Sequence, residues 1–232
     1  MRCGLNSKSC LNIIYLVMTP LVEYLQQLNE SPRPVPAGKT GLIVFDIDDT
    51  LLKADPSDFH IYKTVDGHEV ALTTDEYAKD PDATDPDNQY LFDYRDFADP
   101  VKVYDSIISG TPLLKNLRIL DDYVNAGYDF CFLTARQCEE VVKAALDSFL
   151  KVRRNGKLVP IGDAFNKTLS HAVNDELRGY RGRTDAEKKA NILKDLCRTH
   201  DLVVFVDDDR KNVNAAINLK IGNLKVIKAW DE

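Results

Sequence analysis

Three aspartates and a threonine follow a short apolar run in the first quarter of the chain. The apolar run is Gly41–Phe45, and Asp46, Asp48, Asp49 and Thr50 lie within the five residues after it. Two carboxylates spaced two residues apart point to the same side of an extended chain, and they repel each other unless a cation lies between them. We therefore expect a metal site that includes Asp46 and Asp48. The alternative is that Asp48, Asp49 and Thr50 only cap a turn.

Two later apolar runs also end in polar residues. Tyr128–Leu133 precedes Thr134, and Leu202–Val206 precedes Asp207 and Asp208. Because the carboxyl ends of parallel strands meet at one edge of a sheet, we expect these side chains to lie close to the carboxylates of the first run.

The segments between and after these runs have the spacing of amphipathic helices. The expected helices cover Leu113–Val124, Glu139–Leu150, Thr184–Leu196 and Asn212–Leu219, and a last strand covers Leu224–Ile227. Strands and helices that alternate with short connections predict βαβ units. The expected fold class is therefore α/β, with a parallel sheet flanked by helices.

Capping residues predict where three of these helices begin or end. We expect Thr111 as an N-cap with Pro112 in the first turn, and Gly127 at the end of the same helix. Thr184 and Glu187 have the spacing of a capping box. Gly222 is expected to stop the helix that begins at Asn212.

An insertion separates the first strand from the next helix. Phe59–Leu72 surrounds Asp66-Gly67, which predicts a β-hairpin. From Asp75 to Asp105 there are ten acidic residues and three basic ones, a net charge of −7. We expect this acidic stretch to be a loop-like, solvated region, in preference to a surface that binds cations or a partner.

The amino-terminal part is expected to lie outside the main domain. Thr19 and Pro20 can open a helix, and Ser31–Pro36 reads as an extended linker. Leu11–Met18 loosely imitates a signal peptide, but no small-residue cleavage site follows closely. We therefore expect a cytoplasmic protein, and two alternatives stay open for residues 1–17: a targeting segment, or a stretch that is not translated because Met18 is the working start. The predicted division is an extension over 1–37, a core over 38–54 and 110–232, and an insertion over 55–109.

Bulk composition allows one α/β domain with an insertion, or two small domains. The chain has 232 residues, 44% of them hydrophobic, and a net charge of −7. No apolar run approaches the ~18 residues of a membrane span. The five cysteines lack CxxC spacing and the four histidines lack zinc-ligand spacing, so we expect reduced thiols and no zinc site.

Four segments resemble the motifs of the haloacid dehalogenase superfamily, and specifically its phosphatases. They are Asp46–Leu52, Phe132–Arg136, a lysine within Glu187–Leu193, and Val203–Asp208 with Asn212 beyond it. The resemblance implies a Rossmann-like core, with a cap or flap in the place of residues 55–109. It extends from about Gly38 to the carboxyl end.

The resemblance also implies roles for individual residues. Asp46 is the expected nucleophile and Asp48 the expected acid and base. Mg²⁺ is the implied cofactor, with oxygen ligands from Asp46, the Asp48 carbonyl and Asp207, supported by Asp208.

For the phosphate group, the resemblance implies Thr134 and a lysine. We choose Lys189 over Lys188, because Ile192 and Leu193 then lie on the same helix face. Arg136 either binds substrate or forms a surface ion pair. Asp209 is expected to be a helix N-cap.

The implied activity is magnesium-dependent hydrolysis of phosphomonoesters through an aspartyl phosphate. The expected substrate is a nucleotide or another small phosphorylated metabolite. A 3′-phosphatase acting on polynucleotide ends is the alternative, which basic residues near Arg153 and Arg181 favour and the acidic insertion opposes. A second alternative is a non-catalytic binding protein on the same fold.

Overall fold

The computed structural model describes residues 32–149, 151–154, 157–161 and 165–229. Apart from the first two, these residues belong to one compact unit, Pro34–Glu232. The helix expected after Thr19 and the run Leu11–Met18 lie outside the described residues. The predicted division into extension, core and insertion stays a prediction.

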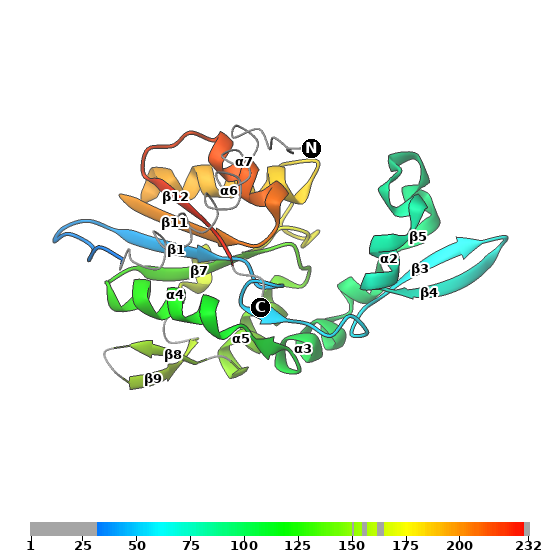
Figure 1. Cartoon of the computed structure of the whole chain (residues 1–232), viewed down its shortest axis with the longest axis horizontal. Coiled ribbons are helices and arrows are strands. Elements are labelled where there is room, and N and C mark those ends of the chain that lie inside the picture. The colour runs from blue at the N-terminus through cyan, green and yellow to red at the C-terminus, as the bar shows by residue number, and fades with distance from the viewer. Residues whose placement is uncertain (1–31, 150, 155–156, 162–164, 230–232) are drawn as a thin grey trace, which may run out of the picture. The chain divides into compact units, whose positions relative to one another are not determined.

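A five-stranded parallel sheet forms the centre of this unit (Figure 1). The middle strand β1 (Gly41–Phe45) pairs with β7 (Asp129–Thr134) on one side and β11 (Leu202–Asp207) on the other. The edges are β10 (His171–Ala172) and β12 (Leu224–Lys228). The strand order therefore reverses between β1 and β11, and ligands bind beyond the carboxyl ends of the strands at such a point. The α/β prediction is confirmed.

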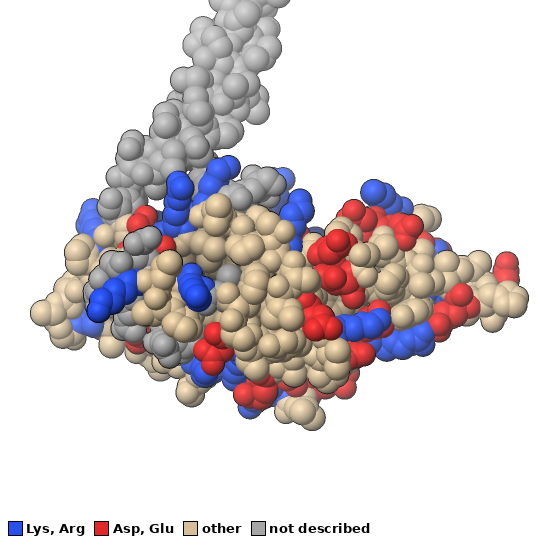
Figure 2. Space-filling view, turned by 90° about the horizontal axis from the view of Figure 1, so that it is seen from below, with Lys and Arg blue, Asp and Glu red and all other residues tan. Residues whose placement is uncertain are grey.

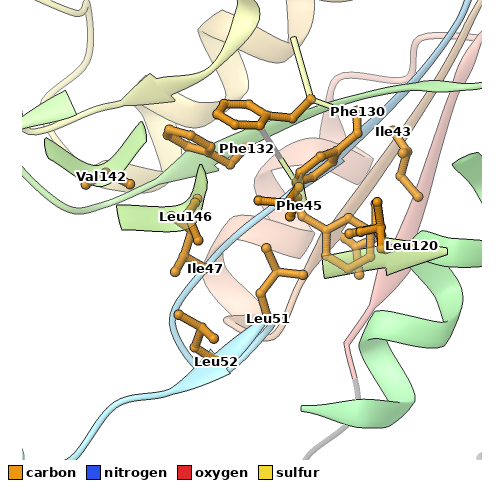
Figure 3. Close-up of a cluster of buried hydrophobic side chains, with 14 of the residues drawn as sticks. Ile43, Phe45, Ile47, Leu51, Leu52, Leu120, Phe130, Phe132, Val142 and Leu146 are labelled. Carbon is orange, nitrogen blue, oxygen red and sulfur yellow. The ribbon is translucent and has the colours of Figure 1, made fainter. Parts of the chain in front are cut away.

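One face of the sheet packs against α4 (Leu114–Asn125) and α5 (Glu139–Phe149). Alternate strand residues, including Ile43, Phe45 and Phe132, belong to this buried cluster, together with helix residues such as Leu120 and Leu146 (Figure 3). Each large apolar side chain buried in this way contributes about 1.5–3 kcal/mol.

The opposite face packs against α6 (Asp185–Thr199) and α7 (Arg210–Asn218). The other alternate residues of β1, Leu42 and Val44, form a second buried cluster with Leu193 of α6 and Ala216 of α7. Both sides of β1 are therefore covered, which explains its unbroken apolar sequence.

The predicted start of α4 is wrong. Thr111–Pro112 forms a short strand, β6, which pairs with β2 (Leu52–Lys53). The helix begins after Leu113, whose side chain makes no cap hydrogen bond. Thr111 and Pro112 form a strand because their backbone pairs with β2, where the insertion leaves and rejoins the core. The predicted end at Gly127 is confirmed by its φ of 93°, since glycine adopts this conformation at low cost.

Two other predicted caps are partly wrong. Thr184 caps α6 as expected, but the Glu187 carboxylate accepts from the backbone N–H of Arg183, so the capping box is incomplete. The helix α7 ends before Gly222, and Lys220 takes the positive φ of 52°. Lys220 therefore has the left-handed backbone conformation that usually favours a glycine after a helix.

The insertion contains regular structure over most of its length, from His60 to Ile108. The hairpin around Asp66-Gly67 is confirmed as β3 (His60–Val65) and β4 (His68–Thr73), with β5 (Phe92–Asp93) on the other side of β3. The remaining elements are helical: α2 (Thr74–Lys79), α3 (Pro100–Ile108), and 3₁₀ turns at Pro81–Thr84, Pro86–Leu91 and Arg95–Ala98.

The prediction of a loop-like acidic stretch is therefore wrong. Aspartates are common in loops, but they are also preferred helix N-caps. Asp99 accepts from the N–H groups of Val101 and Lys102 at the start of α3, and Asp80 accepts from the N–H of Asp82. Figure 2 shows Asp and Glu side chains gathered toward one end of the visible face, with Lys and Arg among them.

Several further elements carboxyl-terminal to α5, β10 among them, were not predicted. A hairpin consists of β8 (Lys151–Arg154) and β9 (Lys157–Pro160), and a 3₁₀ turn at Lys167–Leu169 precedes β10. The side chain of Arg153, on which one argument for a polynucleotide substrate rests, lies outside the described residues. No helix in the described part of the chain is long and apolar enough to cross a membrane.

Candidate active site

Asp46 lies at the carboxyl end of β1, where its backbone N–H still bonds to the carbonyl of Val206. The residue is 6% exposed. Its Oδ1 is 3.0 Å from Lys189 Nζ, but no group among the described residues is aligned to give that oxygen a hydrogen bond. A buried carboxylate oxygen that has an ion pair but no aligned hydrogen bond is incompletely compensated for its burial, which leaves a position for a further ligand.

Lys189 places a positive charge next to the carboxylates of Asp46 and Asp207. It projects from α6, is 1% exposed, and places Nζ 2.8 Å from Asp207 Oδ2 as well as 3.0 Å from Asp46 Oδ1. Burial favours the neutral amine, but Asp46 and Asp207 outweigh it and raise the pKa of Lys189. Lys188 instead donates to Asn174. The geometry thus brings Lys189, the lysine chosen from helix periodicity, to Asp46.

Asp207 ends β11 and is fully buried. In addition to Lys189, its oxygens accept hydrogen bonds from the Asn212 amide at 3.1 Å and from the backbone N–H of Asp209 at 2.9 Å. Asp209 in turn accepts from the N–H of Lys211, so its prediction as the N-cap of α7 is confirmed. These bonds fix the Asp207 carboxylate in one orientation.

Asp208 is held by the loop that follows β1. Its Oδ1 accepts from the Thr50 hydroxyl at 2.9 Å, and its backbone N–H donates to the same hydroxyl at 3.1 Å. Burial raises the pKa of Asp208 to about 6, although the bond from Thr50 opposes the shift. From the sequence, Thr50 was expected at most to cap a turn, whereas in the structure its hydroxyl also binds Asp208.

Three carboxylates converge at this edge of the sheet. One oxygen from each of Asp46, Asp207 and Asp208 lies within 4.8 Å of the others. Burial raises the pKa of Asp46 well above its usual value, because Lys189 only partly offsets it and Asp207 and Asp48 repel the charge. The three carboxylates are hard oxygen donors, and together they carry more negative charge than Lys189 neutralises. Such a set of ligands fits a divalent cation such as Mg²⁺.

The Asp48 side chain points to a different partner. Both of its oxygens accept hydrogen bonds from Arg136, at 2.9 Å from Nε and 2.6 Å from Nη2. Arg136 is 5% exposed, so it is a buried ion-pair partner and not the surface one considered in the sequence analysis. Asp49 forms the turn just after Asp48, with a φ of 51°. Coordination through the Asp48 carbonyl stays a prediction.

Thr134 lies where expected, at the carboxyl end of β7 next to β1. Phe45 of β1 pairs with Phe132 of β7, so Thr134 follows that pair by two residues along β7. Its side chain is buried, and Oγ1 accepts from the N–H of Arg136 at 3.3 Å. Its role as a phosphate ligand stays a prediction.

A pocket of about 640 Å³ opens beside Asp48. Its walls come from both the core and the insertion, and they combine carboxylates, two cations and two aromatic rings: Asp48, Asp49, Asp55, Asp75, Lys53, Arg136, Phe59 and Phe97. The volume is in the range of small-molecule sites.

Comparisons with known proteins add a distant structural likeness. No family model matches the sequence, and no curated protein matches it. An HAD family enzyme from Bacteroides thetaiotaomicron, solved with magnesium and inorganic phosphate, is 11% identical and has a TM-score of 0.43 over 83% of this chain and 95% of that chain. A predicted HAD-like family hydrolase from Porphyromonas gingivalis is 13% identical, with a TM-score of 0.42 over 84% and 93%. Both scores are low, so fold and site rest on this chain's own strands and side chains.

Proposed function

We propose that this chain is a magnesium-dependent phosphomonoester hydrolase of the haloacid dehalogenase type. The observation that carries the proposal is the buried cluster of Asp46, Asp207 and Asp208, in which Asp46 Oδ1 has an ion pair with Lys189 but no aligned hydrogen bond among the described residues. Such a cluster suits a cation and an anionic substrate together, and both are required for phosphoryl transfer.

The residues that hold Mg²⁺ in this proposal are Asp46, Asp207 and Asp208 through their carboxylates, and Asp48 through its carbonyl. The bound ion supplies positive charge that offsets the repulsion between the Asp46 carboxylate and a phosphate dianion. Lys189 adds a fixed positive charge from below, 3.0 Å from Asp46 Oδ1. Thr134 donates its hydroxyl to a phosphate oxygen.

The reaction proceeds in two steps on this chain's own groups. An Asp46 oxygen attacks phosphorus while the bond to the leaving oxygen breaks, and the Asp48 carboxyl group gives its proton to that oxygen. A water molecule then attacks the phosphorus of the aspartyl phosphate. Asp48 takes a proton from this water, and inorganic phosphate leaves as Asp46 is restored.

The pocket beside Asp48 supports a small substrate. The carboxylates of Asp49, Asp55 and Asp75 would repel a leaving group that carries further phosphates. An uncharged leaving group, such as a nucleoside or a sugar, is not repelled. This observation favours a nucleotide or another small phosphorylated metabolite over a polynucleotide end.

The test is release of phosphate from a generic aryl phosphate, measured with and without Mg²⁺. We expect activity that requires the metal, and a loss of about 10³-fold or more in Asp46→Asn, equivalent to about 4 kcal/mol of transition-state stabilisation. Asp129→Asn is the control, because Asp129 is an exposed residue at the start of β7. Unchanged turnover in Asp46→Asn contradicts the nucleophile assignment.

A non-catalytic binding protein predicts a different result. In that case the purified wild-type chain releases no phosphate from nucleotides, sugar phosphates or phosphorylated oligonucleotides, with or without Mg²⁺. The same substrate panel separates small phosphate esters from 3′-phosphorylated ends.

A further inference from the structure

The guanidinium of Arg136 joins two parts of the unit that are distant in sequence. On one side it holds both oxygens of Asp48. On the other side its Nη1 donates to Ser106 Oγ at 2.6 Å and to the carbonyl of Val103 at 3.3 Å, both on α3 of the insertion. Its charge also lies 5.6 Å from the centre of the Phe59 ring.

Ser106 is a buried hydrogen-bond partner of Arg136 on α3. It is 1% exposed, and its hydroxyl donates to the Val103 carbonyl at 3.0 Å while it accepts from Arg136. Both hydrogen-bonding directions of the hydroxyl are therefore used. A buried guanidinium with a fixed partner on each side has little freedom to rotate.

We propose that Ser106 is a positioning residue for the proton-transfer step, and that it acts through Arg136 on Asp48. The inference rests on the proposed function, in which Asp48 gives a proton to the leaving oxygen and later takes one from water. The Asp48 side chain is 41% exposed and lines the pocket, so Arg136 fixes the plane of a carboxyl group that otherwise rotates.

This arrangement makes the insertion part of the catalytic apparatus. The helix α3 packs on α5 of the core, and Ser106 extends that contact to Asp48. A displacement of α3 moves the Ser106 hydroxyl, and with it the carboxyl group that must meet the leaving oxygen. A misplacement of about 1 Å at a reacting group can cost ~10²-fold in rate.

The test compares two substrates in Ser106→Ala. An alkyl phosphate needs a proton on its leaving oxygen, whereas an aryl phosphate with a strongly acidic phenol leaves without one. We expect kcat/KM, which reports the first phosphoryl transfer, to fall about 10-fold or more for the alkyl ester and by less than about threefold for the aryl ester. Ser106→Thr retains the hydroxyl and restores the alkyl activity.

Ser148→Ala is the matched control. Ser148 donates to the carbonyl three residues earlier, Ala145, as Ser106 does to Val103, but on α5, where its hydroxyl lies 3.3 Å from that of Tyr104. Its substrate preference is expected to equal that of wild type. If Ser106→Ala does not fold, Ser106→Cys serves instead, because a thiol occupies a similar space and is a weak acceptor.

The outcomes separate the inference from the function it rests on. An equal loss of kcat/KM on both substrates, or none, overturns the positioning role of Ser106 and leaves the phosphatase assignment intact. A wild-type chain that hydrolyses neither ester overturns the phosphatase assignment itself.

Discussion

The molecule uses aspartate in two contrasting ways. At the carboxyl edge of the sheet, Asp46, Asp207 and Asp208 converge within 4.8 Å, and burial raises the pKa of each. In the insertion, aspartates such as Asp85 and Asp99 accept hydrogen bonds from the backbone N–H groups two residues ahead. These carboxylates of the insertion therefore have hydrogen-bond partners close by, whereas the buried carboxylates at the sheet edge carry more negative charge than Lys189 neutralises.

The difference shows that acidic composition alone does not locate a metal site. The stretch Asp75–Asp105 carries most of the acidic excess, yet its carboxylates are spread over separate caps and ion pairs. What marks the sheet edge is convergence of carboxylates from β1 and β11 under burial. The contrast predicts four experimental differences between the two regions.

The largest effect is expected from removing the buried cation. Lys189→Met leaves Asp46 and Asp207 without their ion-pair partner, and breaking a buried pair in this way costs about 3–5 kcal/mol. Urea unfolding in chelator measures the loss, and added Mg²⁺ is expected to recover part of it. Lys188→Met, which removes a single bond to Asn174, is the control. Equal stability of the two variants contradicts the contrast.

Metal binding should distinguish the two acidic regions directly. A ligand that binds the folded state at 100 times its Kd stabilises it by about 2.7 kcal/mol, so Mg²⁺ is expected to raise the melting temperature. Asp208→Asn should abolish or strongly reduce this rise, and Asp85→Asn should preserve it. A rise that is lost in Asp85→Asn and kept in Asp208→Asn places the cation site in the insertion.

The sequence predicted the sheet edge well because its signals are local. An apolar strand followed by a carboxylate is readable within ten residues, as at Phe45 and Asp46, and helix periodicity is enough to place Lys189, and not Lys188, on the buried face of α6. The contacts that complete the site are not local. Arg136 and Asp48 are 88 residues apart, and Thr50 and Asp208 are 158 apart. Nothing near Ser106 in the sequence signals its contact with Arg136.

The insertion was predicted less well for a different reason. The helix α2 has only six residues, too few to show an apolar period, whereas the nine residues of α3 do carry buried apolar residues four apart, at Val103 and Ile107, a signal that the prediction did not use. Its aspartates suit loops and N-caps equally, and Thr111 suits both an N-cap and a short strand. The hairpin was predicted because Asp66-Gly67 has a specific backbone requirement, and both residues do take positive φ.

A moderate effect is expected from removing a cap in the insertion. Asp99→Ala deprives the first turn of α3 of its side-chain acceptor, which costs about 1 kcal/mol. Asp105→Ala, an exposed position in the same helix, is the control. Chemical unfolding measures both, and the Mg²⁺-dependent rise in melting temperature should be unchanged in each. A loss of the Mg²⁺ response in Asp99→Ala shows that the two regions are coupled in metal binding.

The last prediction is a pH dependence and concerns Asp96, a buried carboxylate of the insertion whose partners include Lys102 and the N–H of His60. Burial opposes ionisation, but hydrogen bonds from Lys102 and from the N–H of His60 outweigh it and lower the pKa of Asp96. A lowered folded-state pKa contributes stability that is present above the unfolded value of about 3.9 and is lost as the pH falls through the folded value. Asp96→Asn should therefore be less stable than wild type at pH 7, and the gap should narrow below about pH 4. A double-mutant cycle with Lys102→Met, followed by urea unfolding, isolates the pair. A coupling that is the same at pH 7 and pH 3 shows that Lys102 does not lower the pKa of Asp96, and contradicts the ion pair as the source of the charge compensation in the insertion.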